Sequence, residues 1–348
     1  MSTLSGSVAV AGAWGYIGRK LLDAAIDLDL KVYAFDPGAM PLDLDANRIV
    51  RIEDEAAFYQ LPADFFHLAI HPEHRQHGFT RLLERANREP IVMLIEKPMA
   101  LPGRPQDCDA IMAAAEHSSA MIFYNFPELF DPLTHRIWQF LATLRDVEIN
   151  HIFLQRSKDR EDPANPRNYK RMVSIQYQES VHCLAFMLSL LAQVQGQLPS
   201  IASQNMHVTA TAEPYTPPNP ADYPQPVDGR CEYSIQLGKT QVNGLTDFKR
   251  NAPGTKRRII RGTSEGQPFE IDAEYFEGRK HLLINRQRIA VDPASSSYAA
   301  IIEAILRWRR DKGADEVRGG LYPNPRLAHR AYQFSELLWQ SAHNSQDP

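Results

Sequence analysis

Short apolar runs alternate with amphipathic stretches over the first 124 residues of the chain. The pattern at residues 8–11 predicts a buried strand, and apolar side chains then recur at helical spacing from Ile17 to Ile26. Further buried strands are predicted at residues 30–35, 65–70, 91–95 and 120–124, with helices near residues 76–88 and 106–117. Strands that alternate with helices in this way predict an α/β fold with a doubly wound parallel sheet.

The pattern changes after residue 124. A helix is expected near residues 132–144, a strand at 148–155, a polar loop to about residue 168 and an apolar helix near 180–192. Residues 213–229 carry six prolines and almost no apolar periodicity, which predicts a surface loop. Successive antiparallel strands are then predicted at 230–237, 240–248, 257–262, 268–274 and 281–289, followed by helices near 298–310 and 326–339. The second half of the chain therefore predicts an open sheet.

Composition narrows the class of protein. The 348 residues are 43% hydrophobic, which suffices for sizeable cores, and the net charge of −4 argues against nucleic acid as the main partner. No apolar stretch is long enough to span a bilayer, and the first strand lies too near Met1 to leave room for a signal peptide. A cytoplasmic protein without a membrane partner is expected. Cys108, Cys183 and Cys231 lie far apart, so we expect isolated thiols and neither a disulfide framework nor a cysteine zinc site.

A glycine turn follows the first predicted strand. Gly12 would allow a tight turn, Gly15 would let the backbone approach a pyrophosphate, and Gly18 would let the helix pack on the strand. Asp36 ends the second strand about 20 residues beyond the turn, where a carboxylate accepts hydrogen bonds from the adenosine ribose and repels a 2′-phosphate. The pattern predicts a dinucleotide site that prefers NAD to NADP, and an ordinary glycine turn is the alternative.

Two further features carry candidate chemistry. Glu96-Lys97-Pro98 ends the predicted strand at residues 91–95, and His182 lies in the predicted helix at residues 180–192. Taken singly, Lys97 could be a surface lysine at a strand end and His182 a core histidine.

These motifs resemble those of the glucose-fructose oxidoreductase / inositol dehydrogenase / rhizopine-catabolism (Gfo/Idh/MocA) family. The resemblance rests on GAWGYIG at residues 12–18, IEKPMA at 95–100, FYNFPELFDPL at 123–133 and the helix that carries His182, and it covers nearly the whole chain. It implies a Rossmann domain for NAD(P) over residues 1–124. It also implies a substrate-binding and oligomerisation domain over residues 125–348, built on an open, mainly antiparallel sheet through which a homodimer or homotetramer would assemble.

The resemblance places the family's catalytic lysine on Lys97 and its catalytic histidine on His182. Oxidation of a secondary alcohol needs a base for the hydroxyl proton, and a histidine with a pKa of about 6.5 suits that task. Lys97 would hydrogen-bond the same oxygen and stabilise the developing alkoxide. Gln178 stands where the family usually has an aspartate, so it could orient the imidazole without supplying charge. If the helix extends one turn earlier, Glu179 lies three residues before His182 and could supply the carboxylate.

Further cofactor contacts are expected from the glycine turn and from the ends of the following strands. The candidates beyond the glycines, Asp36 and Lys97 are Trp14, Tyr16, Ile17, His71, Pro72, Glu96 and Asn125. His71, His74 and His77 are spaced three residues apart and could share one face of a helix, but they lack supporting ligands, so no metal site is expected.

The substrate and the function class stay open at this level. Residues 155–171 contain six basic and three acidic residues, which would attract an acidic or phosphorylated sugar, or which could pair locally in a solvated loop. We predict an NAD-dependent oxidoreductase that transfers hydride between the nicotinamide and a secondary hydroxyl or ketone of a sugar, inositol or related polyol. The alternatives are a non-catalytic dinucleotide-sensing regulator and an NAD-assisted glycosidase or lyase.

Overall fold

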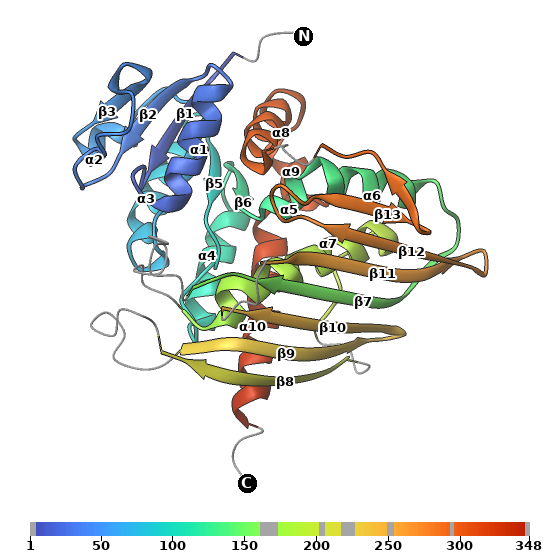
Figure 1. The fold of residues 1–348 in the computed structure, drawn as a ribbon. Helices are drawn as coiled ribbons and strands as arrows, with labels where there is room; N and C mark the ends of the chain where they lie inside the picture. The colour runs from blue at the N-terminus through green and yellow to red at the C-terminus, as the bar shows by residue number, and fades with distance from the viewer. Residues whose placement is uncertain are drawn as a thin grey trace. The chain divides into compact units, whose positions relative to one another are not determined.

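A computed structural model describes residues 5–160, 173–201, 206–216, 227–248, 254–292 and 296–344. The chain divides into two compact units (Figure 1). The first contains Met1–Leu101, Gln106–Asp131 and Ser296–His329, and the second contains Pro102–Pro105, Pro132–Ser295 and Arg330–Pro348. The units are thus interleaved along the chain, whereas the sequence prediction divided it once, after residue 124. That one part of the chain binds the cofactor and the other binds the substrate stays a prediction.

The first unit holds a six-stranded parallel sheet in the order β3-β2-β1-β4-β5-β6. Its strands are β1 (Ser7–Ala11), β2 (Lys31–Phe35), β3 (Ile49–Ile52), β4 (Phe65–Leu68), β5 (Val92–Ile95) and β6 (Met121–Tyr124). The strand order reverses at β1, which confirms the doubly wound sheet. In such sheets ligands bind outside the carboxyl ends of the strands, near this reversal. Strand β3 was not predicted, because Val50 and Arg51 are exposed and leave only two apolar positions facing inward.

Helices connect the strands of the first unit and return to it at the end of the chain. They are η1 (Ala46–Arg48), α1 (Tyr16–Asp27), α2 (Glu55–Phe58), α3 (Pro72–Ala86), α4 (Pro105–Glu116), α5 (Pro127–Phe130), α8 (Ser297–Asp311) and α9 (Ala314–Gly319). Trp308 of α8 packs its ring against Phe123 and Phe130 at centroid distances of 5.2 and 5.7 Å. This aromatic cluster attaches the late helices to the N-terminal core.

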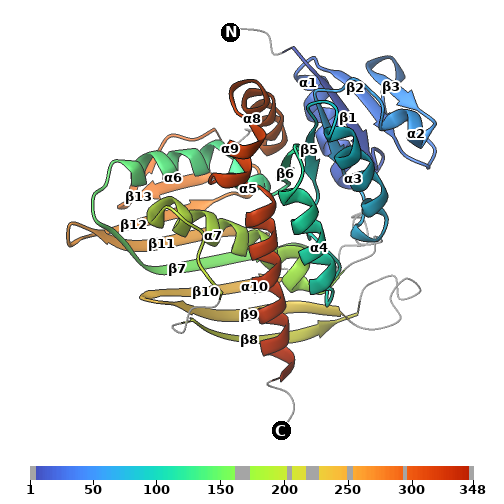
Figure 2. The same cartoon turned by 180° about the vertical axis from the view of Figure 1, so that it is seen from behind.

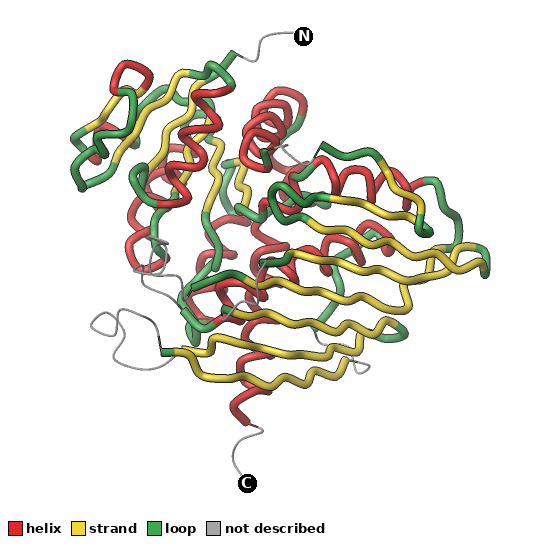
Figure 3. The backbone as a smooth tube through the Cα atoms, in the orientation of Figure 1, coloured by secondary structure: helices red, strands yellow, loops and turns green. Residues whose placement is uncertain are grey.

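The second unit holds an eight-stranded sheet in the order β14-β13-β12-β11-β7-β10-β9-β8. Figure 3 draws the strands in yellow. Its strands are β7 (Val147–Ser157), β8 (Met206–Tyr215), β9 (Val227–Leu237), β10 (Thr240–Asp247), β11 (Lys256–Ser264), β12 (Gln267–Glu274), β13 (His281–Ile284) and β14 (Gln287–Ile289). Strands β7 and β10 pair in parallel and the other neighbours pair antiparallel, which confirms the mainly antiparallel sheet. The helices α6 (Pro132–Ala142), α7 (Val181–Gln195) and the C-terminal part of α10 (Pro325–Asn344) lie over one face of this sheet (Figure 2).

Three predictions for the second half of the chain need correction. Residues 281–289 form the hairpin β13–β14 and not a single strand, since Asn285 and Arg286 adopt positive φ angles of 50° and 66° in the turn. The loop predicted at 213–229 is wrong at both ends, because β8 runs to Tyr215 and β9 begins at Val227, while residues 217–226 lie outside the described residues. Strand β8 was not predicted, because it is an edge strand with few buried side chains.

The three cysteines are free and buried, as expected, and burial raises the pKa of the Cys231 thiol to about 12. Among the described residues, no helix combines the length and the apolar character needed to cross a membrane.

Candidate active site

The glycine turn between β1 and α1 is too tight for side chains at two positions. Gly12 has a φ of +74°, and a Cβ atom there would lie 2.5 Å from the carbonyl oxygen of Ala69. A Cβ atom at Gly18 would lie 2.2 Å from the carbonyl oxygen of Gly12. Gly15 precedes the first residue of α1 and offers no side-chain cap to the helix N–H groups. The N–H groups of Gly12, Ala13 and Gly15 are already hydrogen-bonded within the fold. A pyrophosphate would therefore accept backbone hydrogen bonds from the start of α1, which has no side-chain cap.

Asp36 fastens this turn to the end of β2. Its Oδ2 accepts a hydrogen bond from the backbone N–H of Trp14 at 3.1 Å, and its Oδ1 accepts one from Gly38 at 2.9 Å. Each carboxylate oxygen keeps further acceptor capacity for a ribose hydroxyl. Trp14, Tyr16 and Ile17 are partly exposed around the same turn, as cofactor contacts need to be. The cradle and the carboxylate thus fit a dinucleotide.

A buried polar cluster surrounds Glu96 at the end of β5. The Glu96 Oε1 atom accepts a hydrogen bond from Asn125 Nδ2 at 2.5 Å and lies 2.9 Å from Nε2 of His67. Arg75 of α3 donates to the carbonyl oxygens of Glu96, Pro98 and Met99. Lys97 follows Glu96 and is partly exposed. Sequence reasoning identified Glu96, Lys97 and Asn125 but missed His67 and Arg75.

His71 and Pro72 begin α3, one strand away from the glycine turn. His71 caps the helix, since its Nδ1 accepts a hydrogen bond from the backbone N–H of Glu73 at 3.4 Å, and Pro72 is the first helical residue. The apolar pattern predicted this helix near residues 76–88, and the structure begins it at Pro72. Within the described ranges, no group of three or more histidine, cysteine or acidic side chains is arranged to hold a metal ion.

The segment before His182 in the second unit is a π-helical turn, η3 (Gln176–Ser180). All five of its side chains are hydrogen-bonded or ion-paired. The contacts are Gln176 with Asp228 at 2.9 Å, Tyr177 with Glu336 at 2.6 Å, Gln178 with the Val173 N–H at 3.1 Å, Glu179 with Arg156 at 2.6 Å and Ser180 with Thr246 at 2.7 Å. Rare π-turns of this kind recur at functional sites. His182 follows this turn in α7 and is buried.

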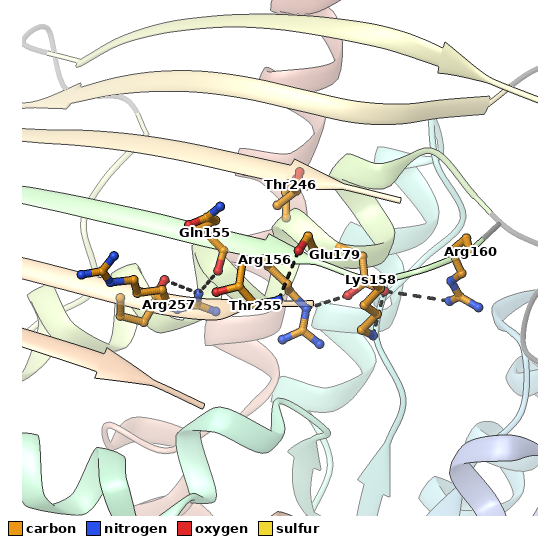
Figure 4. A network of polar contacts seen from close by, with 11 residues as sticks. Gln155, Arg156, Lys158, Arg160, Glu179, Thr246, Thr255 and Arg257 are labelled. Atoms are coloured by element: carbon orange, nitrogen blue, oxygen red, sulfur yellow. Dashed lines mark hydrogen bonds and ion pairs between the residues drawn. The ribbon is translucent and has the colours of Figure 1, made fainter. Parts of the chain in front are cut away.

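The carboxylate of Glu179 lies among three cationic side chains (Figure 4). Its oxygens lie 2.6 Å from Arg156 Nε, 2.8 Å from Lys158 Nζ and 3.9 Å from Arg160 Nη2. The α-helical spacing assumed for Gln178 and Glu179 was wrong, because the π-turn contains more residues per turn than an α-helix. That Glu179 supplies a carboxylate to His182 stays a prediction. The same carboxylate would also have to keep these ion pairs.

The predicted site residues fall into two sets. The first unit contains the glycine turn, Asp36, His71, Pro72, Glu96, Lys97 and Asn125, and the second contains Gln178, Glu179 and His182. The members of the first set follow β1, β2, β4, β5 and β6, whose carboxyl ends meet at one edge because the strands are parallel. Most of residues 155–171, the predicted basic loop, lies outside the described residues.

No family model and no curated protein matches this chain, but many solved structures do. A levoglucosan dehydrogenase in complex with NADH and levoglucosan has a TM-score of 0.72 and 12% identity, over 99% of this chain and 98% of that chain. A UDP-N-acetylglucosamine 3-dehydrogenase from Acidithiobacillus ferrooxidans has a TM-score of 0.70 and 14% identity, over 98% and 99%. A myo-inositol dehydrogenase from Corynebacterium glutamicum has a TM-score of 0.69 and 17% identity, over 99% and 100%.

The chain has the fold of these dehydrogenases. Its two sheets are the ones that the resemblance to the Gfo/Idh/MocA family implied. At identities of 12–17% the agreement extends to the fold and leaves the activity to be argued from the site.

Proposed function

We propose that the protein is an NAD-dependent oxidoreductase acting on a secondary hydroxyl or ketone of a sugar, inositol or related polyol. The observation that carries the proposal is the arrangement of the first sheet. The glycine turn, Asp36 and Glu96-Lys97-Pro98 follow β1, β2 and β5, so they share the edge where ligands bind in doubly wound sheets. A lysine at the same sheet edge as a dinucleotide cradle suits hydride chemistry at an alcohol or ketone.

Each group at the site has its own proposed role. A bound nicotinamide would supply the hydride acceptor or donor. The backbone around Gly12, Gly15 and Gly18 would hold the pyrophosphate, and Asp36 would accept from the ribose hydroxyls. The ammonium of Lys97 would hydrogen-bond the reacting oxygen and stabilise charge that develops on it. We assign transfer of the hydroxyl proton to His182, which the resemblance to the family marks and which lies in α7 two residues after the π-turn.

We further propose that the enzyme is cytoplasmic and assembles as a homodimer or homotetramer through the second sheet. The sheet face opposite α6 and α7 supports this assembly, because no described helix of the second unit covers it (Figures 1 and 2). Cross-strand ion pairs such as Arg257–Asp272 at 2.6 Å and Arg261–Glu270 at 2.7 Å occupy β11 and β12.

The proposal is tested by the appearance of reduced-nicotinamide absorbance when the purified protein meets NAD and a panel of sugars, inositols and uronic acids. Turnover on one group of substrates is expected, and it identifies the substrate class. NAD binding without turnover across the panel would contradict the dehydrogenase proposal. That outcome would favour a dinucleotide-sensing regulator or an NAD-assisted glycosidase or lyase, and cofactor that survives purification unconsumed would single out the latter.

Asp36 is expected to set the preference for NAD over NADP. We expect Asp36→Asn to shift the ratio of the two dissociation constants by about tenfold toward NADP, because it removes the charge that repels a 2′-phosphate. Titration of the protein with each reduced cofactor, followed by nicotinamide fluorescence, measures the ratio. Asp45→Asn is the matched control, since Asp45 caps η1 and asparagine caps a helix equally well. An unchanged ratio in Asp36→Asn would show that this carboxylate only supports the turn.

A further inference from the structure

Arg75 lies inside the first unit and reaches the segment that carries Lys97. Its side chain starts on the first turn of α3, and only 4% of the residue is exposed. The Nη1 atom donates to the carbonyl oxygen of Glu96, and the Nη2 atom donates to those of Pro98 at 2.6 Å and Met99 at 2.9 Å. One guanidinium thus binds the backbone on both sides of Lys97.

The sheet fixes this part of the backbone only as far as Glu96, whose N–H group donates to the carbonyl oxygen of Leu68 at 3.4 Å. The register of β5 with β4 and with β6 ends at Ile95, so the residues after it leave the ladder. Pro98 has no N–H group to donate. Arg75 therefore supplies hydrogen-bond donors to the backbone carbonyls of residues 96, 98 and 99, as a neighbouring strand would within the ladder.

Burial of the Arg75 charge at this place costs free energy. Burial lowers the pKa of the Arg75 guanidinium, and the guanidinium donates to neutral carbonyl oxygens. No carboxylate among the described residues forms an ion pair with it, although the nearby Glu96 carboxylate raises the pKa in part. The planar guanidinium fork with its five fixed donors is well suited to bind three carbonyls of four successive residues at once.

We propose that Arg75 is the positioning residue for Lys97. By holding the carbonyl oxygens on either side of it, Arg75 fixes the direction in which the Lys97 side chain leaves the backbone. The consequence for turnover rests on the proposed function. The effect on the position of the Lys97 side chain does not rest on the proposed function, because Arg75 makes its hydrogen bonds in the protein without substrate or cofactor.

The same helix offers a matched control. Arg85 of α3 is also buried and also donates to two backbone carbonyl oxygens, those of Tyr59 at 2.8 Å and Leu61 at 2.9 Å. Its acceptors precede β4 and lie outside the Lys97 segment. A lysine at either position keeps the charge and loses the fork.

The test compares Arg75→Lys with Arg85→Lys in the full chain, after both are shown to fold by circular dichroism. Arg75→Lys is expected to lower kcat by about 10–100-fold with the KM for NAD nearly unchanged, since a displacement of about 1 Å can cost that much. Arg85→Lys is expected to leave both constants close to wild type. In Arg75→Ala, added guanidinium ion is expected to restore part of the lost kcat, which a general loss of stability would not allow.

A second measurement needs no turnover. The rate of reductive methylation of Lys97, followed by mass spectrometry of the intact fold, is expected to rise at least about threefold in Arg75→Lys toward that of the exposed Lys31. Arg75→Gln serves in the same assay if Arg75→Lys does not fold. Equal effects of the Arg75 and Arg85 variants, or an unchanged Lys97 rate, would overturn the positioning role. If the wild-type protein shows no turnover but Arg75→Lys still alters the methylation rate of Lys97, the proposed function is refuted and the positioning role of Arg75 is retained.

Discussion

Lys97→Met is expected to lower kcat by about 10²–10³-fold while the dissociation constant for NAD changes little. The reason is that the ammonium is proposed to donate to an oxygen whose charge develops only during the reaction, and loss of such a donor has an effect of this size. Methionine nearly keeps the length of the lysine stem, so packing beside Glu96 and Pro98 is preserved. Steady-state kinetics on the best substrate of the panel and a separate NAD titration measure the two quantities.

The control for this variant is Lys31→Met. Lys31 begins β2 in the same unit, is exposed, and lies over the ring of Tyr33 at 4.9 Å, so its replacement is expected to leave kcat within about twofold of wild type. Equal kcat values for Lys97→Met and wild type would remove Lys97 from the chemistry. A loss of NAD affinity in parallel with kcat would instead assign Lys97 to cofactor binding.

Five strands of the first sheet, all but β3, could be predicted because most of their side chains are buried on both faces. Such strands appear in the sequence as continuous apolar runs, and the predicted 65–70 and 91–95 differ from β4 and β5 by one or two residues at an end. The exposed strand β3 and the edge strand β8 lack that signal, since half or more of their side chains face water. The β13–β14 turn was missed for another reason: Asn285 and Arg286 adopt positive φ angles without a glycine to indicate them.

The site was predictable where its contacts are local in sequence. The glycine turn and Asp36 are recognised by their spacing, and the structure shows Asp36 bound to the turn itself. His67 and Arg75 could not be identified in this way, because their partners around Glu96 lie 21 to 29 residues further along the chain. A single histidine within the apolar strand Phe65–Leu68 was the one available signal.

The π-turn before His182 shows a further limit of periodicity. Gln176–Ser180 continues directly into α7, so its pattern is read as one more turn of the same helix. The difference lies in tertiary contacts to β7, β9, β10 and α10, which fix four of the five side chains of the turn. These contacts pair Glu179 with Arg156, whereas α-helical spacing predicted that it would lie beside His182.

Glu179→Gln is expected to destabilise the second unit by about 3–5 kcal/mol, because it leaves buried cations without the carboxylate they contact. The Glu179 side chain is 1% exposed, and those of Arg156 and Arg160 are 4% and 6% exposed. The two units need not unfold together, so the change is best measured by hydrogen exchange of peptides from β7 and α7 as denaturant is added. Peptides from β1 and β5 report on the first unit and are expected to keep their protection.

Glu270→Gln provides the matched control in the same sheet. Glu270 pairs with Arg261 at 2.7 Å, but both side chains are well exposed, so its replacement is expected to cost less than about 1 kcal/mol. Similar small losses in both variants would mean that solvent screens the Glu179 cluster and that its charges do not stabilise the sheet. The pH dependence of kcat in Glu179→Gln adds a separate test, because a profile identical to that of wild type would exclude Glu179 as the carboxylate that tunes His182.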